Sequence, residues 1–128
     1  MLLKNITTYC KPLFPFAFWM LISIVTMLLL MEHTGAMVGF PHMDKIIHAI
    51  LFAMLTTIGY LAYSNYSRRL YLGLMGYGIM TEIMQGALTI TRYASIYDWI
   101  ADTVGILLAI FSIKIIESYS AMKTPHVS

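Results

Sequence analysis

The sequence predicts an all-α membrane protein, a bundle of four transmembrane helices, and three observations lead to this class. The 128 residues are 59% hydrophobic and 11% charged, whereas an ordinary soluble domain is about 25% charged. Four apolar segments approach the roughly 20 residues that are needed to cross the hydrocarbon core of a bilayer. The connections between the last three are short. A chain of this length forms one domain, so residues 1–128 are expected to make a single membrane domain.

The first two spans are predicted at 13–31 and 45–63. The segment 13–31 carries no charged residue. It exceeds the 7–15 apolar residues of a signal peptide, and no convincing cleavage site follows it, so we expect a retained helix. The segment 45–63 is apolar apart from its first turns and is opened by the sequence PHMDK.

The third and fourth spans are predicted at 70–90 and 95–116. Both carry acidic residues inside otherwise apolar sequence. Because the connections at 64–69 and 91–95 are short, consecutive helices should be antiparallel neighbours. The residues 117–128 are more polar, and we expect a frayed tail there.

The distribution of basic residues predicts the orientation. With four spans, the N-terminus, the 64–69 connection and the C-terminus share one side of the membrane. Most of the cations belong to that side, namely Lys4, Lys11, Arg68, Arg69, Lys114 and Lys123. The other side has only Lys45 and Arg92. Since short cytoplasmic loops are enriched in Lys and Arg, both termini should be cytoplasmic.

Polar side chains recur at helical spacing within the predicted spans. One stripe of the third span consists of Gly78, Glu82, Gln85, Thr89 and Arg92, and one stripe of the fourth consists of Asp98, Asp102, Gly105, Ala109 and Ser112. Asp44 and His48 are four residues apart and can interact on one helix face. Steps of three and four residues keep side chains on one face of a helix. We therefore expect these stripes to face one another inside the bundle, in the external half of the membrane.

The energetic cost of these residues supports an interior position. An ionised Asp or Arg near the centre of a span costs about 2.5–3.5 kcal/mol, whereas one Leu or Ile contributes only about −0.3 to −0.6 kcal/mol. Such residues normally pair, line a wet cavity or carry function. Four acids, namely Asp44, Glu82, Asp98 and Asp102, face two fixed cations. Either a carboxyl group is protonated, or a cation or a positively charged ligand completes the site.

Three motifs resemble those of the VanZ-like family of small bacterial membrane proteins. They are DKIIHAILF (44–52), EIMQ (82–85) and RYASIYDWIADTVG (92–105). The family pattern is D-K-x-x-H-x-x-x-F, then E-x-x-Q, then R-x-x-S-x-x-D-x-x-x-N-x-x-G, in this order. The resemblance covers about residues 44–110. The chain departs from the pattern at one position, because Asp102 stands where the family usually carries Asn.

The resemblance implies a multi-pass protein of the bacterial cytoplasmic (inner) membrane. It also implies a role at the cell envelope, linked to resistance to the glycopeptide teicoplanin. The expected partner is a membrane lipid, a lipid-linked envelope component or the antibiotic itself. The small net charge of +2, with basic residues scattered along the chain, argues against nucleic acid as a partner. The sequence identifies no cofactor.

Two readings of the polar residues stay open, a binding site and an intramembrane enzyme. In an enzyme, acid/base catalysis would fall to His48, oriented by Asp44, and to Glu82, with Asp98 beside them. Binding of a ligand would fall to Lys45, Gln85, Arg92, Ser95 and Asp102, because the cations can hold a phosphate. No established catalytic motif is present, so the sequence leaves enzymatic activity undecided.

Further readings of the same residues are a metal site, a proton or ion relay, and simple packing. Imidazole and carboxylates can bind a metal, but the spacing is not specific to a ligand set, so the sequence assigns no metal ligand. A relay of protons or ions would use the same acids. In the packing reading, these groups only bond one another and lock the helices together.

Overall fold

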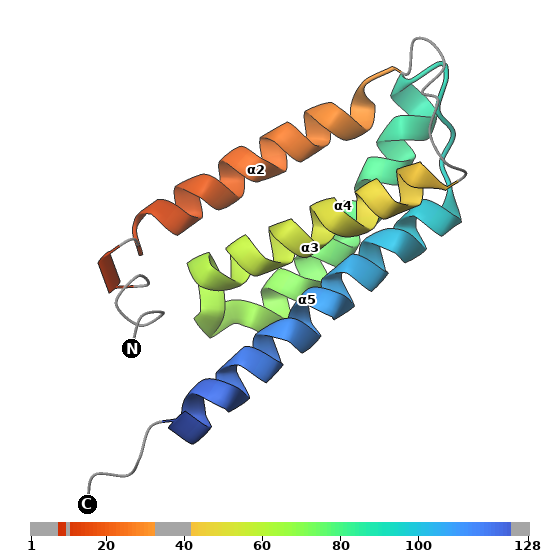
Figure 1. Ribbon diagram of the computed structural model, residues 1–128. Coiled ribbons are helices and arrows are strands. Elements are labelled where there is room, and N and C mark those ends of the chain that lie inside the picture. The colour runs from red at the N-terminus through yellow and green to blue at the C-terminus, as the bar shows by residue number, and fades with distance from the viewer. Residues whose placement is uncertain (1–7, 10, 33–41, 124–128) are drawn as a thin grey trace, which may run out of the picture.

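The computed structural model describes residues 8–9, 11–32 and 42–123, and Figure 1 shows their arrangement. Within these ranges the chain is helical and contains no strand. The elements, in chain order, are α2 (Leu13–Leu30), α3 (Met43–Tyr63), the 3-10 helix η1 (Ser64–Tyr66), α4 (Ser67–Leu88) and α5 (Ile96–Lys123). The predicted all-α class is confirmed. Lys4, which the orientation argument uses, lies outside the described residues.

Three helical segments of the described chain are long and apolar enough to cross a membrane. They are Leu13–Leu30, Met43–Leu88 and Ile96–Lys123. The second segment joins α3, η1 and α4, and it folds back on itself at η1, so that α3 and α4 lie side by side (Figure 1). The presence of helices able to span a membrane is therefore confirmed.

Two boundaries differ from the predicted ones. The helix α5 continues through residues 117–123, where we expected a frayed tail. The sequence ESYSAMK has no Gly or Pro to stop a helix, and Lys123 in the last turn favours the negative end of the helix dipole. Similarly, most of the predicted connection 64–69 is helical, because η1 spans only three residues and α4 already begins at Ser67.

Apolar side chains line both the inside and the outside of the described helices. The central helix α3 contacts α2, α4 and α5, and most extensively α5. The apolar core consists of Phe18, Val25, Leu29, Phe52, Leu55, Leu74 and Ile106. Large apolar side chains on the outside, such as Ile83, Leu107 and Phe111, are 59–66% exposed. An outer surface of this kind suits a lipid environment rather than water.

The second turn of α3 and the third turn of α5 approach each other closely. Gly105 of α5 faces the backbone of Ala49 in α3, and a Cβ atom at position 105 would collide with the Ala49 carbonyl. Small residues allow membrane helices to approach in this way. His48 precedes Ala49, and Asp102 lies one turn before Gly105, so the contact places these two polar side chains opposite each other.

We expect Gly105→Ala to destabilise the protein, because the added methyl group meets backbone atoms that cannot move independently. The expected loss is about 1–3 kcal/mol, as for other overpacked cores. It exceeds the gain of about 0.5–1 kcal/mol in helix propensity. Thermal unfolding of the purified protein in detergent measures the effect.

The matched control is Gly73→Ala in α4, where a Cβ atom would meet nothing within 4 Å. This variant should be as stable as the unmodified protein or slightly more stable, because it gains only helix propensity. An equal effect of the two substitutions would contradict the close α3–α5 contact.

Candidate functional site

The polar residues gather at one end of the bundle, which we call the site end. Here α2 and α4 end and α3 and α5 begin (Figure 1). His48 lies five residues from the start of α3, Glu82 six from the end of α4, and Asp102 six from the start of α5. At about 1.5 Å per residue, all three lie about 8–9 Å inside the helix ends. The site is therefore below the surface of the bundle but far from its middle.

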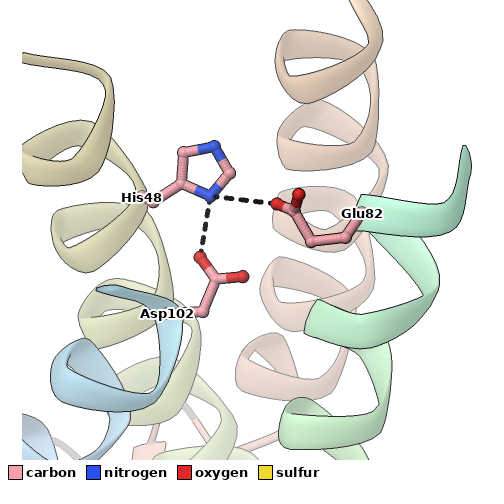
Figure 2. A group of neighbouring side chains, drawn as sticks. All are labelled: His48, Glu82 and Asp102. Atoms are coloured by element: carbon pink, nitrogen blue, oxygen red, sulfur yellow. Dashed lines mark hydrogen bonds and ion pairs between the residues drawn. The ribbon is translucent and has the colours of Figure 1, made fainter. Parts of the chain in front are cut away.

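His48, Glu82 and Asp102 form a compact group, which we call the buried cluster (Figure 2). His48 Nδ1 lies 2.8 Å from Asp102 Oδ1, within hydrogen-bond distance, and 4.0 Å from Glu82 Oε1. His48 is 0% exposed, Asp102 is 1% exposed and Glu82 is 6% exposed. Three different helices thus bring an imidazole and two carboxylates together out of contact with the surroundings.

The buried cluster contains polar atoms that no neighbouring group satisfies. Among the described residues, no hydrogen-bond partner reaches His48 Nε2, Glu82 Oε1 or Asp102 Oδ2. The 4.0 Å from Glu82 Oε1 to the imidazole permits electrostatic attraction but is too long for a hydrogen bond. A buried polar atom without a partner costs about 1–3 kcal/mol, and more when the group is charged. Three such atoms in one place can accept or donate bonds to a water molecule, an ion or a ligand.

Glu82 is positioned by the segment that connects α4 to α5. Its second oxygen, Oε2, accepts a hydrogen bond of 2.7 Å from the backbone N–H of Ser95. The Ser95 hydroxyl accepts a long bond of 3.4 Å from the backbone N–H of Asp98, in the first turn of α5. Ser95, which the sequence suggests as a ligand-binding residue, therefore holds Glu82 through its backbone and caps α5 through its side chain.

Lys45, Asp44 and Asp98 form a separate ion-pair group nearer the site end. The Lys45 amine lies 3.0 Å from Asp98 Oδ1 and 3.3 Å from Asp44 Oδ2. The Asp98 side chain is 10% exposed, whereas that of Asp44 is 45% exposed. The single positive charge of Lys45 neutralises only one of the two negative charges in this group.

The histidine partner differs from the one that helix spacing suggests. Asp44 was expected to orient His48 from one turn earlier, but the carboxylate bonded to His48 is that of Asp102 on α5. Asp44, in the first turn of α3, pairs with Lys45. Asp102, which we placed among ligand-binding residues, takes the orienting position.

Gln85 and Arg92 tie the site to the first helix. Gln85 Nε2 donates a hydrogen bond of 2.7 Å to the backbone carbonyl of Leu29, and Arg92 Nη1 donates one of 2.8 Å to the same oxygen. Leu29 lies in the last turn of α2, where carbonyls lack helical partners. Both residues were predicted to bind a ligand. In the structure they fasten the end of α2 to α4 and to the α4–α5 connection, and their ligand-binding role stays a prediction.

Glu32 also contributes to the site end, although the sequence analysis does not place it among the candidate residues. Its carboxylate accepts hydrogen bonds from the backbone N–H groups of Ile90, at 2.5 Å, and Thr91, at 3.0 Å, and from the Thr91 hydroxyl. These bonds connect the end of α2 to the α4–α5 connection. A negative charge just past a helix C-terminus is repelled by the negative end of the helix dipole. The position of Glu32 in the sequence therefore indicates that its partners belong to another segment.

The charges of the buried cluster do not balance. Among the described residues, no carboxylate lies within 4.0 Å of Arg92, and Lys45 serves the ion-pair group. Glu82 and Asp102 therefore have only His48 as a cationic partner. With both acids ionised, the cluster carries a charge of −2 when His48 is neutral and −1 when it is protonated. Chemically, the cluster can hold a cation, accept hydrogen bonds from a ligand or exchange a proton.

Metal binding is also within reach of this geometry. His48, Glu82 and Asp102 each offer one ligand atom, and these atoms lie within 4.8 Å of one another. Two cavities of about 530 and 500 Å³ lie elsewhere on the described part of the chain, because none of their lining residues belongs to the buried cluster.

No family model, curated protein or solved structure matches the chain.

The bonds to Glu32 predict an acidic transition at the site end. The hydroxyl of Thr91 and the N–H of Ile90 hold the pKa of Glu32 below its ordinary value of 4.5, because they favour the carboxylate form. A depressed pKa stabilises the folded form above the ordinary value, and the effect disappears as the pH falls through the lowered pKa. The link should therefore be intact at neutral pH and open only below pH 4.5.

A 13C NMR titration of the Glu32 carboxyl group measures this transition. The midpoint should lie below 4.5, move upward in Thr91→Ala, and stay nearly unchanged in Thr91→Ser, which keeps the hydroxyl group. A midpoint at or above the ordinary value in the unmodified protein would disprove the link.

Proposed function

We propose that this chain is a VanZ-like protein of the bacterial cytoplasmic membrane that crosses the bilayer four times. The helices α2, α3, α4 and α5 would each make one crossing, with the turn at η1 and both termini in the cytoplasm. Two observations support the orientation. Lys11, Arg68, Arg69, Lys114 and Lys123 belong to the end opposite the site, and the site end has only Lys45 and Arg92.

The proposed function is the binding of a cationic group of an envelope component from the outer side of the membrane. One observation carries this proposal. Glu82 and Asp102 are buried with one unsatisfied oxygen each, and no Lys or Arg of the described residues lies within 4.0 Å of either carboxylate. A ligand that brings a positive charge or hydrogen-bond donors would satisfy both oxygens. An amine-bearing lipid headgroup, a lipid-linked precursor or a glycopeptide such as teicoplanin has this chemistry.

An intramembrane acid/base enzyme is the second candidate, and a specific contact favours it. His48 Nδ1 is bonded to Asp102 Oδ1, while His48 Nε2 has no partner among the described residues. A carboxylate that orients an imidazole in this way leaves the opposite nitrogen ready to take or give a proton. The expected reaction would be hydrolysis or group transfer on a lipid-linked envelope substrate.

The proposed topology predicts the behaviour of fusions to alkaline phosphatase, which folds only outside the cytoplasm. Fusions after Tyr66 and after Lys123 should be inactive, and a fusion after Ile90 should be active. A fluorescent protein that folds only in the cytoplasm should give the opposite pattern at the same three positions. An active phosphatase after Lys123 would overturn the orientation.

The proposed binding site predicts that Glu82→Gln and His48→Ala weaken binding of a glycopeptide or a lipid-linked precursor by at least about tenfold. Losing one hydrogen bond to a charged group costs about 1.5–3 kcal/mol, which corresponds to this range. Binding to the protein in nanodiscs, measured by calorimetry, is the test, with the amount of folded protein checked for each variant.

Glu117→Gln is the matched control, because Glu117 is an acid of α5 far from the site end and accepts a bond from the Tyr60 hydroxyl. It should leave binding unchanged. If all three variants bind alike, the buried cluster is only a packing element. Release of a product from the bound precursor would identify the enzyme instead.

A further inference from the structure

We propose that the buried cluster is a site for one divalent transition-metal ion, with zinc as the best match. His48 Nδ1 and one carboxylate oxygen each from Glu82 and Asp102 would be its ligands. The proposal rests on the same unsatisfied carboxylates as the function proposed above, but here the cation that neutralises them is a metal ion. The ion would hold a fourth ligand, which is a water molecule or a group of the envelope substrate.

The distances within the buried cluster suit a tetrahedral ion. Zinc binds imidazole nitrogen and carboxylate oxygen at about 2.0–2.2 Å, so two ligands of one tetrahedral ion lie about 3.3–3.6 Å apart. The observed separations from His48 Nδ1 are 2.8 Å to Asp102 Oδ1 and 4.0 Å to Glu82 Oε1. The required distance lies between these two values. Small rotations of the two carboxylates, which move each oxygen by several tenths of an ångström, would bring both distances to it.

The direction of the side chains also suits an ion between them. The Glu82 carboxylate points toward His48 Nδ1 from α4, and the Asp102 carboxylate points toward it from α5 (Figure 2). The Nε2 atom of His48 points away from both acids, so it can carry the ring proton without competing for the ion (Figure 2). The unsatisfied oxygen of Glu82 is aimed into the cluster, and the residue is more than nine-tenths buried.

Charge balance gives an independent reason for a divalent ion. Two ionised carboxylates with a neutral imidazole carry −2, which a single divalent cation cancels completely. Protonation of His48 cancels only half of this charge. Because ionised groups inside a membrane protein are costly when unpaired, complete neutralisation favours the divalent ion over a proton. The nearby carboxylates of Asp44 and Asp98 already have Lys45 and do not compete for it.

The surroundings hold the ligands in place, as a metal site requires. The Ser95 N–H donates to Glu82 Oε2, which leaves Oε1 directed at the imidazole. Bonds of this kind to the non-ligating oxygen orient carboxylates at metal sites. On the other side, Gly78 packs closely against Asp102, because a Cβ atom at position 78 would lie only 3.0 Å from Asp102 Oδ2.

The ligand set indicates which ion would bind. The imidazole favours zinc or another transition metal, whereas magnesium and calcium prefer sites made of oxygen alone. Binding requires a free lone pair on Nδ1. In the neutral imidazole the single ring proton would then sit on Nε2, so this form binds the ion without releasing a proton. An imidazolium would release one proton for each ion bound.

Asp102→Asn is the sharpest test, because it changes one atom and restores the residue that the VanZ-like pattern carries. Asparagine can still bond His48 through its amide but supplies no negative charge. We expect the purified protein to retain about one zinc ion per chain after dialysis. Asp102→Asn should bind zinc at least about 100-fold more weakly, since even outer-shell changes cost about 10–100-fold.

Elemental analysis of the protein in detergent gives the stoichiometry, and competition with a coloured chelator gives the affinity. Cobalt should replace zinc and give the visible absorption of a tetrahedral Co²⁺ site, which Asp102→Asn should abolish. The matched control is Asp44→Asn on α3, because Asp44 contacts Lys45 and not the buried cluster. This variant should retain zinc with unchanged affinity.

The results separate the metal proposal from the proposed function. If the unmodified protein binds no more zinc than Asp102→Asn, the metal proposal is overturned. Loss of precursor binding in His48→Ala would then still support the ligand site. Conversely, zinc that is retained by the unmodified protein and lost in Asp102→Asn, together with unchanged precursor binding in Glu82→Gln, would support the metal and overturn the proposed function. Equal loss of zinc in Asp44→Asn would place the ion outside the buried cluster and overturn the assignment.

Discussion

Helices α3 and α5 meet backbone to backbone where Gly105 faces the carbonyl of Ala49. His48 and Asp102 are the nearest polar neighbours of this contact, so the distance between imidazole and carboxylate depends on it. A larger residue at position 105 would push the helices apart by the width of a methyl group or more. At that separation a hydrogen bond of 2.8 Å could not form. The site thus depends on a glycine that takes no part in its chemistry.

The second constraint is that buried polar groups need partners in a low-dielectric interior. At the site end most of them have one. Gln85 and Arg92 share the carbonyl of Leu29, and Ser95 holds one oxygen of Glu82. The unsatisfied side-chain atoms of the described residues are concentrated in the buried cluster instead of being scattered. This concentration is the physical reason for placing both the binding function and the metal ion there.

The two groups of charges at the site end have different roles because they differ in depth. Lys45 with Asp98 and Asp44 lies nearer the surroundings, where water or lipid headgroups can complete the solvation of Asp44. The buried cluster has no such access, so a proton, a cation or a ligand must balance it. The helix α2 also helps to form the site. Leu29 and Glu32 at its end bond the α4–α5 connection, which in turn positions Glu82.

Much of the fold and part of the site could be predicted from the sequence, because both rest on local periodicity. Apolar runs determined the helices to within a few residues, apart from the C-terminal end of α5, and spacings of three and four placed Glu82 and Asp102 on inward faces. The partner of His48 could not be predicted, since it depends on how closely α5 approaches α3 and on where Asp44 points. The same holds for Gln85 and Arg92, whose acceptor is a backbone carbonyl of another helix, visible in no side-chain pattern. The sequence determined which residues face the interior. Only the tertiary structure decided which of them touch, because that depends on distances and rotations between helices.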